Sequence, residues 1–206
     1  MAMKGEGIGR RSLLAAVGLW MARPVFARAA AAKPRVAIQT DHGTIVVELE
    51  AAKAPISSTN FLRYVDAGKY DGGQFYRASR KPGVAGAGTI QGSASPKARL
   101  FRPIAHESTQ VTGLRHKAGT ISLARNAPGS ATSDFFICAS PQPYLDAHPG
   151  APGDNQGFAA FGNVVEGMAV VKKILALPTP GKTSLPEMKG QILDPPVKIL
   201  SMKRVA

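Results

Sequence analysis

Ser133-Asp134-Phe135-Phe136-Ile137 is the stretch that decides the fold class of this 206-residue chain. Aromatic and β-branched residues favour a β-strand, in which successive side chains point to opposite faces of the sheet. Asp134 and Phe136 would therefore share one face, and Phe135 and Ile137 the other. The pattern predicts a strand with one fully apolar face toward a core and one face that borders a pocket.

Short strands of this kind recur along the chain. The runs 35–40 and 43–50 are separated by Asp41-His42-Gly43, which predicts a hairpin with Ile45, Val47 and Leu49 on its inward face. Further strands are expected over 73–77, 90–92, 119–124, 134–139, 158–165 and 197–202. The last of them is expected to pair back to the first.

Two helices interrupt the strands. Pro55 opens the first at a position that needs no N–H donor, and Gly68 ends it. Residues 166–177 form the second, which we expect to begin at Glu166. Eight short strands without βαβ alternation predict a mainly β fold, a closed eight-stranded antiparallel β-barrel capped by two α-helices.

The N-terminus has the order of an export signal. The pair Arg10-Arg11 precedes an apolar run over 12–22, and small residues follow over 26–32. The run is shorter than the roughly 20 residues of a membrane span. The twin arginine is typical of a Tat signal. We therefore expect residues 1–29 to be a cleaved export signal, residues 30–206 to be one domain, and the protein to be periplasmic or secreted.

Composition narrows the range of partners and cofactors. The formal net charge is +13, but the basic residues are scattered and aromatic residues make up only 6% of the chain, which argues against a nucleic-acid reader. The single Cys138 excludes an internal disulfide and is expected to be a small buried hydrophobe. His106 and His116 are too isolated to predict a metal site. We expect no metal, no cofactor and a monomer.

One further string, Phe75-Tyr76-Arg77, places a guanidinium beside aromatic residues. Arginine keeps its proton, so it is suited to polarise or orient a substrate and unsuited to act as a general base. No nucleophile and base pattern accompanies it in the sequence.

Together the blocks resemble the cyclophilin family of peptidyl-prolyl cis-trans isomerases, over residues 36–202 and most closely its bacterial exported branch. The blocks that carry the resemblance are Phe75-Tyr76-Arg77, Ile90-Gln91-Gly92, Ile121-Ser122-Leu123-Ala124, Asp134-Phe135-Phe136-Ile137, Tyr144-Leu145-Asp146 and Phe161-Gly162-Asn163-Val164. The resemblance implies an isomerase that acts on proline-containing polypeptides and assists the folding of exported proteins.

The resemblance also implies roles for individual residues. Arg77 matches the family's catalytic arginine and Gln91 the glutamine beside it. Substrate-binding positions are implied for Ala124 and Arg125, whose backbone would meet the peptide, and for Asp134, Phe136, Tyr144, Leu145 and Phe158, of which Phe136, Leu145 and Phe158 would wall the proline pocket.

The chain departs from the family at several of these positions. Arg77 and Gln91 are further apart in sequence than is usual, and Gly88-Thr89 replaces a Phe-Met pair that forms one apolar wall. We expect that wall to be either missing or supplied by the inserted loop, with Val84 or Ile90 as the candidates. Asp134 stands where the family usually has Gln, and we consider it a salt-bridge partner for Arg77 or Arg125. Tyr144 stands where Trp is frequent, which predicts weakened binding of cyclosporin.

Two other classes of function stay open from the sequence. The same groove suits a non-catalytic module that binds proline-rich peptides. A basic adhesion or scaffold protein on an acidic surface is a weaker alternative, since it would explain the charge but not the arginine and glutamine together.

Overall fold

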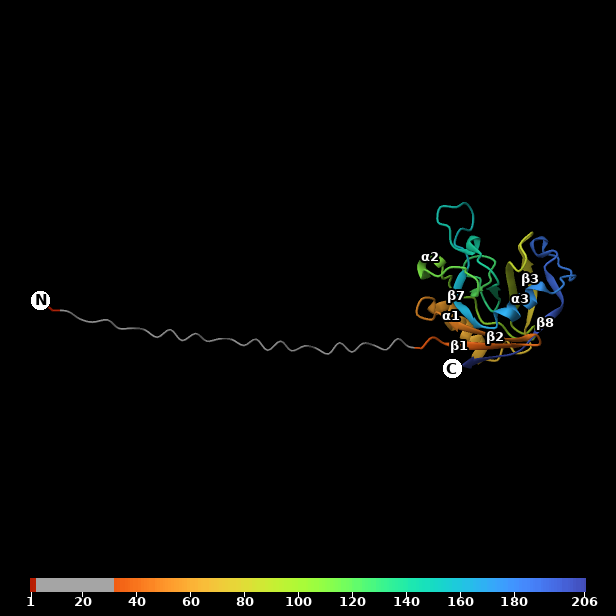
Figure 1. The fold of residues 1–206 in the computed structure, drawn as a ribbon, viewed down its shortest axis with the longest axis horizontal. Helices are drawn as coiled ribbons and strands as arrows, with labels where there is room; N and C mark the ends of the chain where they lie inside the picture. The colour runs from red at the N-terminus through yellow and green to blue at the C-terminus, as the bar shows by residue number, and fades with distance from the viewer. Residues whose placement is uncertain (3–31) are drawn as a thin grey trace. The chain divides into compact units, whose positions relative to one another are not determined.

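The computed structural model describes residues 1–2 and 32–206. Residues 32–206 form a closed barrel whose strands follow the order β1-β2-β7-β5-β6-β4-β3-β8, all neighbours being antiparallel (Figure 1). The strands are β1 (Arg35–Thr40), β2 (Gly43–Leu49), β3 (Gln74–Arg80), β4 (Gly88–Ser93), β5 (Thr120–Leu123), β6 (Phe135–Cys138), β7 (Ala159–Glu166) and β8 (Ile192–Val205). The predicted eight-stranded antiparallel barrel is thus confirmed.

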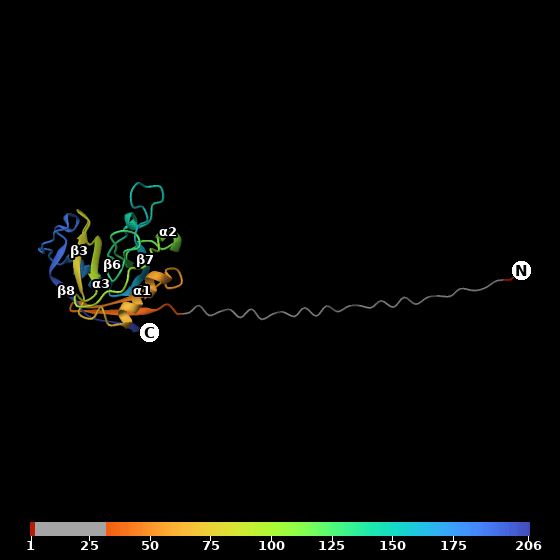
Figure 2. The ribbon, with the colours of Figure 1, turned by 180° about the vertical axis from the view of Figure 1, so that it is seen from behind.

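The last strand closes the barrel, as the sequence suggested. β8 pairs with β1 through Ile38↔Met202 and with β3 through Phe75↔Val197. Viewed from behind, β3 and β8 lie side by side on the wall of the barrel (Figure 2). The first and the last strand of the chain are therefore neighbours in one continuous sheet.

The helices differ from expectation in number and in one boundary. α1 (Pro55–Asp66) begins and ends where expected and packs on β7 and β8, while α3 (Met168–Ala176) packs on β2, β3 and β4. A third helix, α2 (Thr109–Thr112), was not predicted, because a single helical turn carries no apolar periodicity. Glu166 ends β7 rather than beginning a helix, since Gly167 turns the chain with a φ of 86°.

Along β6, core and pocket side chains alternate, as the pattern of Ser133–Ile137 predicts. Phe135 and Ile137 are fully buried in the barrel interior. Phe135 makes edge contacts with Phe61 of α1, their ring centroids lying 5.6 Å apart, and with Phe75 of β3 at 5.5 Å. The other face of β6, which carries Phe136, lines a pocket on the outside of the barrel.

No helix among residues 1–2 and 32–206 is long and apolar enough to span a membrane. The predicted export signal, residues 1–29, lies outside the described residues.

Candidate functional site

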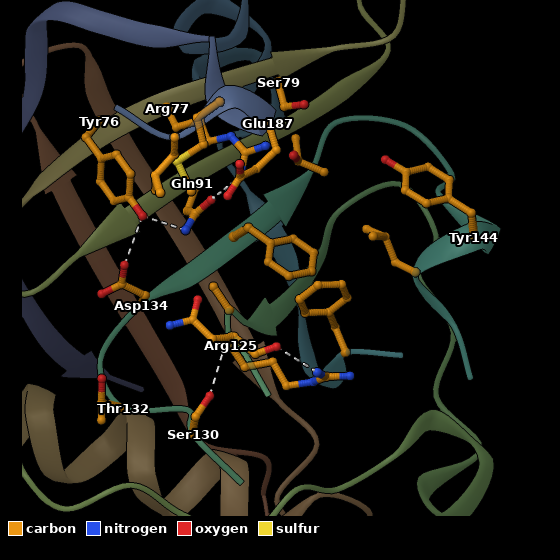
Figure 3. A pocket seen from close by; sticks show the side chains of 18 residues that line it. Tyr76, Arg77, Ser79, Gln91, Arg125, Ser130, Thr132, Asp134, Tyr144 and Glu187 are labelled. Atoms are coloured by element: carbon orange, nitrogen blue, oxygen red, sulfur yellow. Dashed lines mark hydrogen bonds between the residues drawn. The ribbon is translucent and has the colours of Figure 1, made fainter. Parts of the chain in front are cut away.

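A pocket of about 580 Å³ opens on the outer face of β3, β4 and β6 (Figure 3). All nine residues predicted for the site line it. They are Arg77, Gln91, Ala124, Arg125, Asp134, Phe136, Tyr144, Leu145 and Phe158. The pocket therefore gathers side chains from segments that lie far apart in the sequence.

A β-bulge places Arg77 in this pocket. Phe75 pairs with Gly92 and Arg77 pairs with Gln91, so Tyr76 and Arg77 together oppose one residue of β4. A bulge re-aims the side chains that follow it. Phe75 and Ala78 face the core, while Tyr76 and Arg77, although adjacent in sequence, both line the pocket.

Two glutamine side chains hold the guanidinium of Arg77. Its Nη1 donates to Oε1 of Gln91 at 3.0 Å, and its Nε donates to Oε1 of Gln191 at 2.8 Å. Burial lowers the pKa of Arg77 from its ordinary value, and nearby Tyr76 and Glu187 oppose that shift. Within the described part of the chain no carboxylate forms a salt bridge with it, so its positive charge stays available to a ligand.

The long separation between Arg77 and Gln91 does not pull the two apart. The ladder between β3 and β4 runs on to Arg80↔Gly88, and the residues between those two form the hairpin loop. The backbone N–H of Lys81 donates to the carbonyl of Ala87 at 2.9 Å and closes that loop. The extra residues therefore lie beyond the ladder that sets the pairing of Arg77 with Gln91.

An aromatic wall faces the guanidinium across the pocket. The rings of Phe136 and Phe158 meet edge to face with centroids 5.4 Å apart. Behind Phe136, the imidazole of His116 stacks at 5.7 Å with an interplanar angle of 17°. Leu145 completes the apolar lining on this side.

His116 is buried in a network that sequence reasoning missed. Because Asp146 is an acceptor only, Nδ1 of His116 donates to its Oδ1 at 2.7 Å, and Nε2 lies 3.0 Å from the hydroxyl of Ser122. Burial lowers the pKa of His116, while the hydrogen bond with Asp146 raises it. The neutral ring fixes the position of Phe136 in front of it.

The side chain of Arg125 is bound to the protein itself. It forms a salt bridge with Asp154 and donates to the carbonyl of Gly157, and its guanidinium lies 5.2 Å from the ring centroid of Phe158. Only 4% of the side chain is exposed. Arg125 therefore offers its backbone to the pocket, together with that of Ala124, while its side chain supports the aromatic wall.

Asp134 does not pair with either arginine. Its Oδ2 accepts a hydrogen bond from the hydroxyl of Tyr76 at 2.9 Å (Figure 3), and Ser133 approaches its Oδ1 at 3.3 Å. The expected salt bridge is wrong because Arg77 and Arg125 are already held by other acceptors. Burial raises the pKa of Asp134, and its two hydrogen bonds lower it.

The missing apolar wall comes from an unexpected part of the chain. Val84 is 47% exposed in the hairpin loop and does not line the pocket, and Ile90 is fully buried in the core. Leu185 and Met188, in and beside the turn η2 (Pro186–Met188), line the pocket instead. No local sequence signal links that turn to β4.

Cys138, Tyr144 and the histidines were also considered one by one in the sequence. Cys138 is fully buried in β6, as expected, and burial raises the pKa of its thiol to about 12. Tyr144 lies at the pocket rim and is 68% exposed. Among residues 1–2 and 32–206, no three His, Cys, Asp or Glu side chains are grouped to hold a metal ion.

Comparison with known proteins decides the family. Residues 35–204 match the family model described as cyclophilin type peptidyl-prolyl cis-trans isomerase/CLD. The chain belongs to the cyclophilin family. A peptidyl-prolyl cis-trans isomerase of Acinetobacter baylyi is 37% identical over 175 residues, which cover 84% of this chain and 87% of the relative. Peptidyl-prolyl cis-trans isomerase B of Escherichia coli is 34% identical over 145 residues, or 70% and 85% of the two chains.

A solved cyclophilin has the same fold. The crystal structure of a Cryptosporidium parvum cyclophilin type isomerase in the presence of the dipeptide Ala-Pro aligns with a TM-score of 0.60 and 21% identity. The alignment covers 84% of this chain and 99% of the Cryptosporidium parvum chain. The chain is therefore a cyclophilin in sequence and in architecture, and an isomerase by class.

Proposed function

We propose that this isomerase twists X-Pro peptide bonds with Arg77 as the polarising group, and that its substrates are proline-containing segments of exported proteins. The observation that carries the catalytic part is the half-buried guanidinium, held by Gln91 and Gln191, opposite the Phe136 and Phe158 wall.

The chemistry of the reaction suits such a site. Amide resonance imposes a barrier of roughly 18–20 kcal/mol on rotation, and no bond has to break. In the twisted transition state the prolyl nitrogen regains its lone pair, so a donor aimed at that nitrogen favours the transition state over the ground state. A charged guanidinium supplies the donor, and the aromatic wall holds the proline ring while the acyl side turns.

The other site residues take roles that follow from their positions. Gln91 orients the guanidinium. The backbone of Ala124 and Arg125 holds the residue before proline in an extended pose, and Leu145 completes the ring pocket. Tyr144 lies at the rim, where it meets the flanking substrate residue.

Replacing Arg77 tests the catalytic role. Arg77→Ala is expected to lower turnover by about 10²–10³-fold, because a transition-state donor is removed. Arg77→Lys keeps the charge but cannot satisfy both glutamine oxygens in one plane, so it is expected to recover only part of the rate. Isomerisation of a short Ala-Pro peptide measures both, with circular dichroism to verify folding. A folded Arg77→Ala protein with the wild-type rate would contradict the proposed catalytic role of Arg77.

The export part of the proposal rests on residues 1–29 and not on the barrel. The twin arginine, apolar run and small residues support export through a Tat-type route to the periplasm or the outside. Replacing Arg10 and Arg11 together by Lys is expected to retain the protein in the cytoplasm, as measured by cell fractionation. Unchanged export of that variant would exclude the twin-arginine route, and a cytoplasmic wild type would exclude export.

A further inference from the structure

Four side chains in the pocket form one continuous chain of hydrogen bonds. Nη1 of Arg77 donates to Oε1 of Gln91 at 3.0 Å, and Nε2 of Gln91 donates to the hydroxyl oxygen of Tyr76 at 2.5 Å. The hydroxyl of Tyr76 then donates to Oδ2 of Asp134 at 2.9 Å. Figure 3 shows these side chains following one another across β3, β4 and the start of β6.

The two ends of the chain fix the direction of every hydrogen bond within it. A guanidinium only donates, so Gln91 has to turn its oxygen toward Arg77. An ionised carboxylate only accepts, so the hydroxyl of Tyr76 has to donate its hydrogen bond to Asp134 and to accept one from the NH₂ group of Gln91. Because one end is a cation and the other an anion, the reverse arrangement is excluded.

Local backbone structure brings the chain together. The bulge in β3 places Tyr76 and Arg77 side by side opposite Gln91, so both reach the same amide. Without the bulge, adjacent residues of a strand would point to opposite faces, so Tyr76 and Arg77 would not both line the pocket. Gln91 itself is 8% exposed, so the pocket wall restricts its side chain.

The proton on Tyr76 is held firmly. Burial raises the pKa of Tyr76 well above its ordinary value, and the charge of Asp134 raises it further. Asp134 forms no salt bridge within the described residues, so its charge is directed along this chain and not toward a neighbouring cation.

We infer that Tyr76 and Asp134 are positioning residues of this isomerase, which lock the amide of Gln91 in one orientation and through it hold Arg77 ready for the substrate. The inference rests on the proposed role of Arg77. A glutamine amide that turned over would place its NH₂ group against the guanidinium, donor against donor, and would leave Arg77 held by Gln191 alone. Asp134, which stands where the resemblance leads one to expect a glutamine, supplies the fixed direction that an amide at that position would not.

Two isosteric substitutions test this inference in the full chain. Asp134→Asn removes the charge, and Tyr76→Phe removes the hydroxyl. Each is expected to lower kcat by about tenfold, less than the loss of Arg77 itself, while KM stays within about twofold because the ring pocket is untouched. The double variant is expected to be no slower than the slower single variant, since both act through one chain. Asp134→Glu, which keeps the carboxylate, is expected to recover part of the lost kcat.

The matched control is Tyr64→Phe. The hydroxyl of Tyr64 accepts a hydrogen bond from the backbone N–H of Phe101 at 2.8 Å, away from the pocket. This variant is expected to lose stability but not kcat. Folded Asp134→Asn and Tyr76→Phe proteins with wild-type kcat would overturn the inference, as would losses that multiply in the double variant. The wild type and Arg77→Ala, run beside them, report separately on the proposed function.

Discussion

Arg77 is charged and half-buried, and two glutamine oxygens, rather than a carboxylate, accept its N–H groups, so no ion pair within the described residues neutralises it. A carboxylate partner would compete with the substrate for the positive charge. Two carboxylates line the same pocket: Asp134 is bound to Tyr76, and Glu187 forms no salt bridge with Arg77 within the described residues. At the level of residues, the site is arranged to orient a cation without neutralising it.

His116 gives a prediction at the same scale. Burial lowers its pKa in the folded protein below the ordinary value of 6.5, so the unfolded chain binds a proton more readily than the folded one. The contribution of His116 to stability is therefore complete above pH 6.5 and is lost as the pH falls through the lower pKa of the folded protein. Denaturant unfolding measured below pH 6.5 is expected to show a free energy of unfolding that falls as the pH is lowered.

The variant His116→Gln isolates this effect. It is expected to be less stable at neutral pH, because it breaks the network with Asp146 and Ser122, and to lose part of the pH dependence. If the variant and the wild type showed parallel stability curves below pH 6.5, the buried imidazole would not be the group that titrates.

Among the elements, the hairpin of β3 and β4 has the greatest influence on the site, because its ladder aligns Arg77 with Gln91. Gly88 begins β4 with a φ of 147°, and a Cβ at that position would lie 2.0 Å from the carbonyl oxygen of Ser79. The close approach of the two backbones depends on this glycine.

Gly88→Ala is therefore expected to destabilise the protein by more than about 2 kcal/mol and to lower activity by disturbing the register. Gly83→Ala is the matched control, since Gly83 also has a positive φ, of 73°, but a Cβ there would meet nothing within 4 Å. The control is expected to cost about 1 kcal/mol and to keep the wild-type rate. Thermal melts and peptide isomerisation measure both; equal losses in the two variants would contradict this account of Gly88.

The elements also show what sequence can and cannot predict. The strands and α1 were predictable because alternation, β-branched runs and a proline at the helix start are local signals. Arg77, Gln91 and Phe136 were identified by resemblance, and all line one pocket. Gln191 was not identified, since its bond to Arg77 joins residues 114 positions apart. The bulge that brings Tyr76 and Arg77 to one face has no sequence signature, so the link between Tyr76 and Asp134 was also missed.

On the scale of the whole molecule, β8 joins the two ends of the sheet. It pairs with β1 along Arg35–Thr40 and with β3 beside Arg77, where Ile192 is the partner. Met202, opposite Ile38, is 2% exposed and belongs to the core. The strand that closes the barrel thus also supports the strand that carries the arginine.

Ending the chain after Ser201 is expected to cost at least about 3 kcal/mol, from the loss of a buried methionine alone. It also leaves β1 with an unpaired edge over most of its length, which favours aggregation. Removal of Ala206 alone, which lies outside β8, is the control and is expected to have no effect. Urea unfolding and light scattering measure the two outcomes, and a truncated protein as stable as the control would show that β8 is not needed for closure.

The hairpin loop between Arg80 and Gly88 has a practical consequence. The pairing of β3 with β4, and not the length of the loop, sets the distance from Arg77 to Gln91. The loop is therefore a site where other sequences can be inserted at a fixed distance from the guanidinium. A fluorescent label, an affinity tag or a client-binding peptide grafted there would be delivered next to the pocket without moving the arginine.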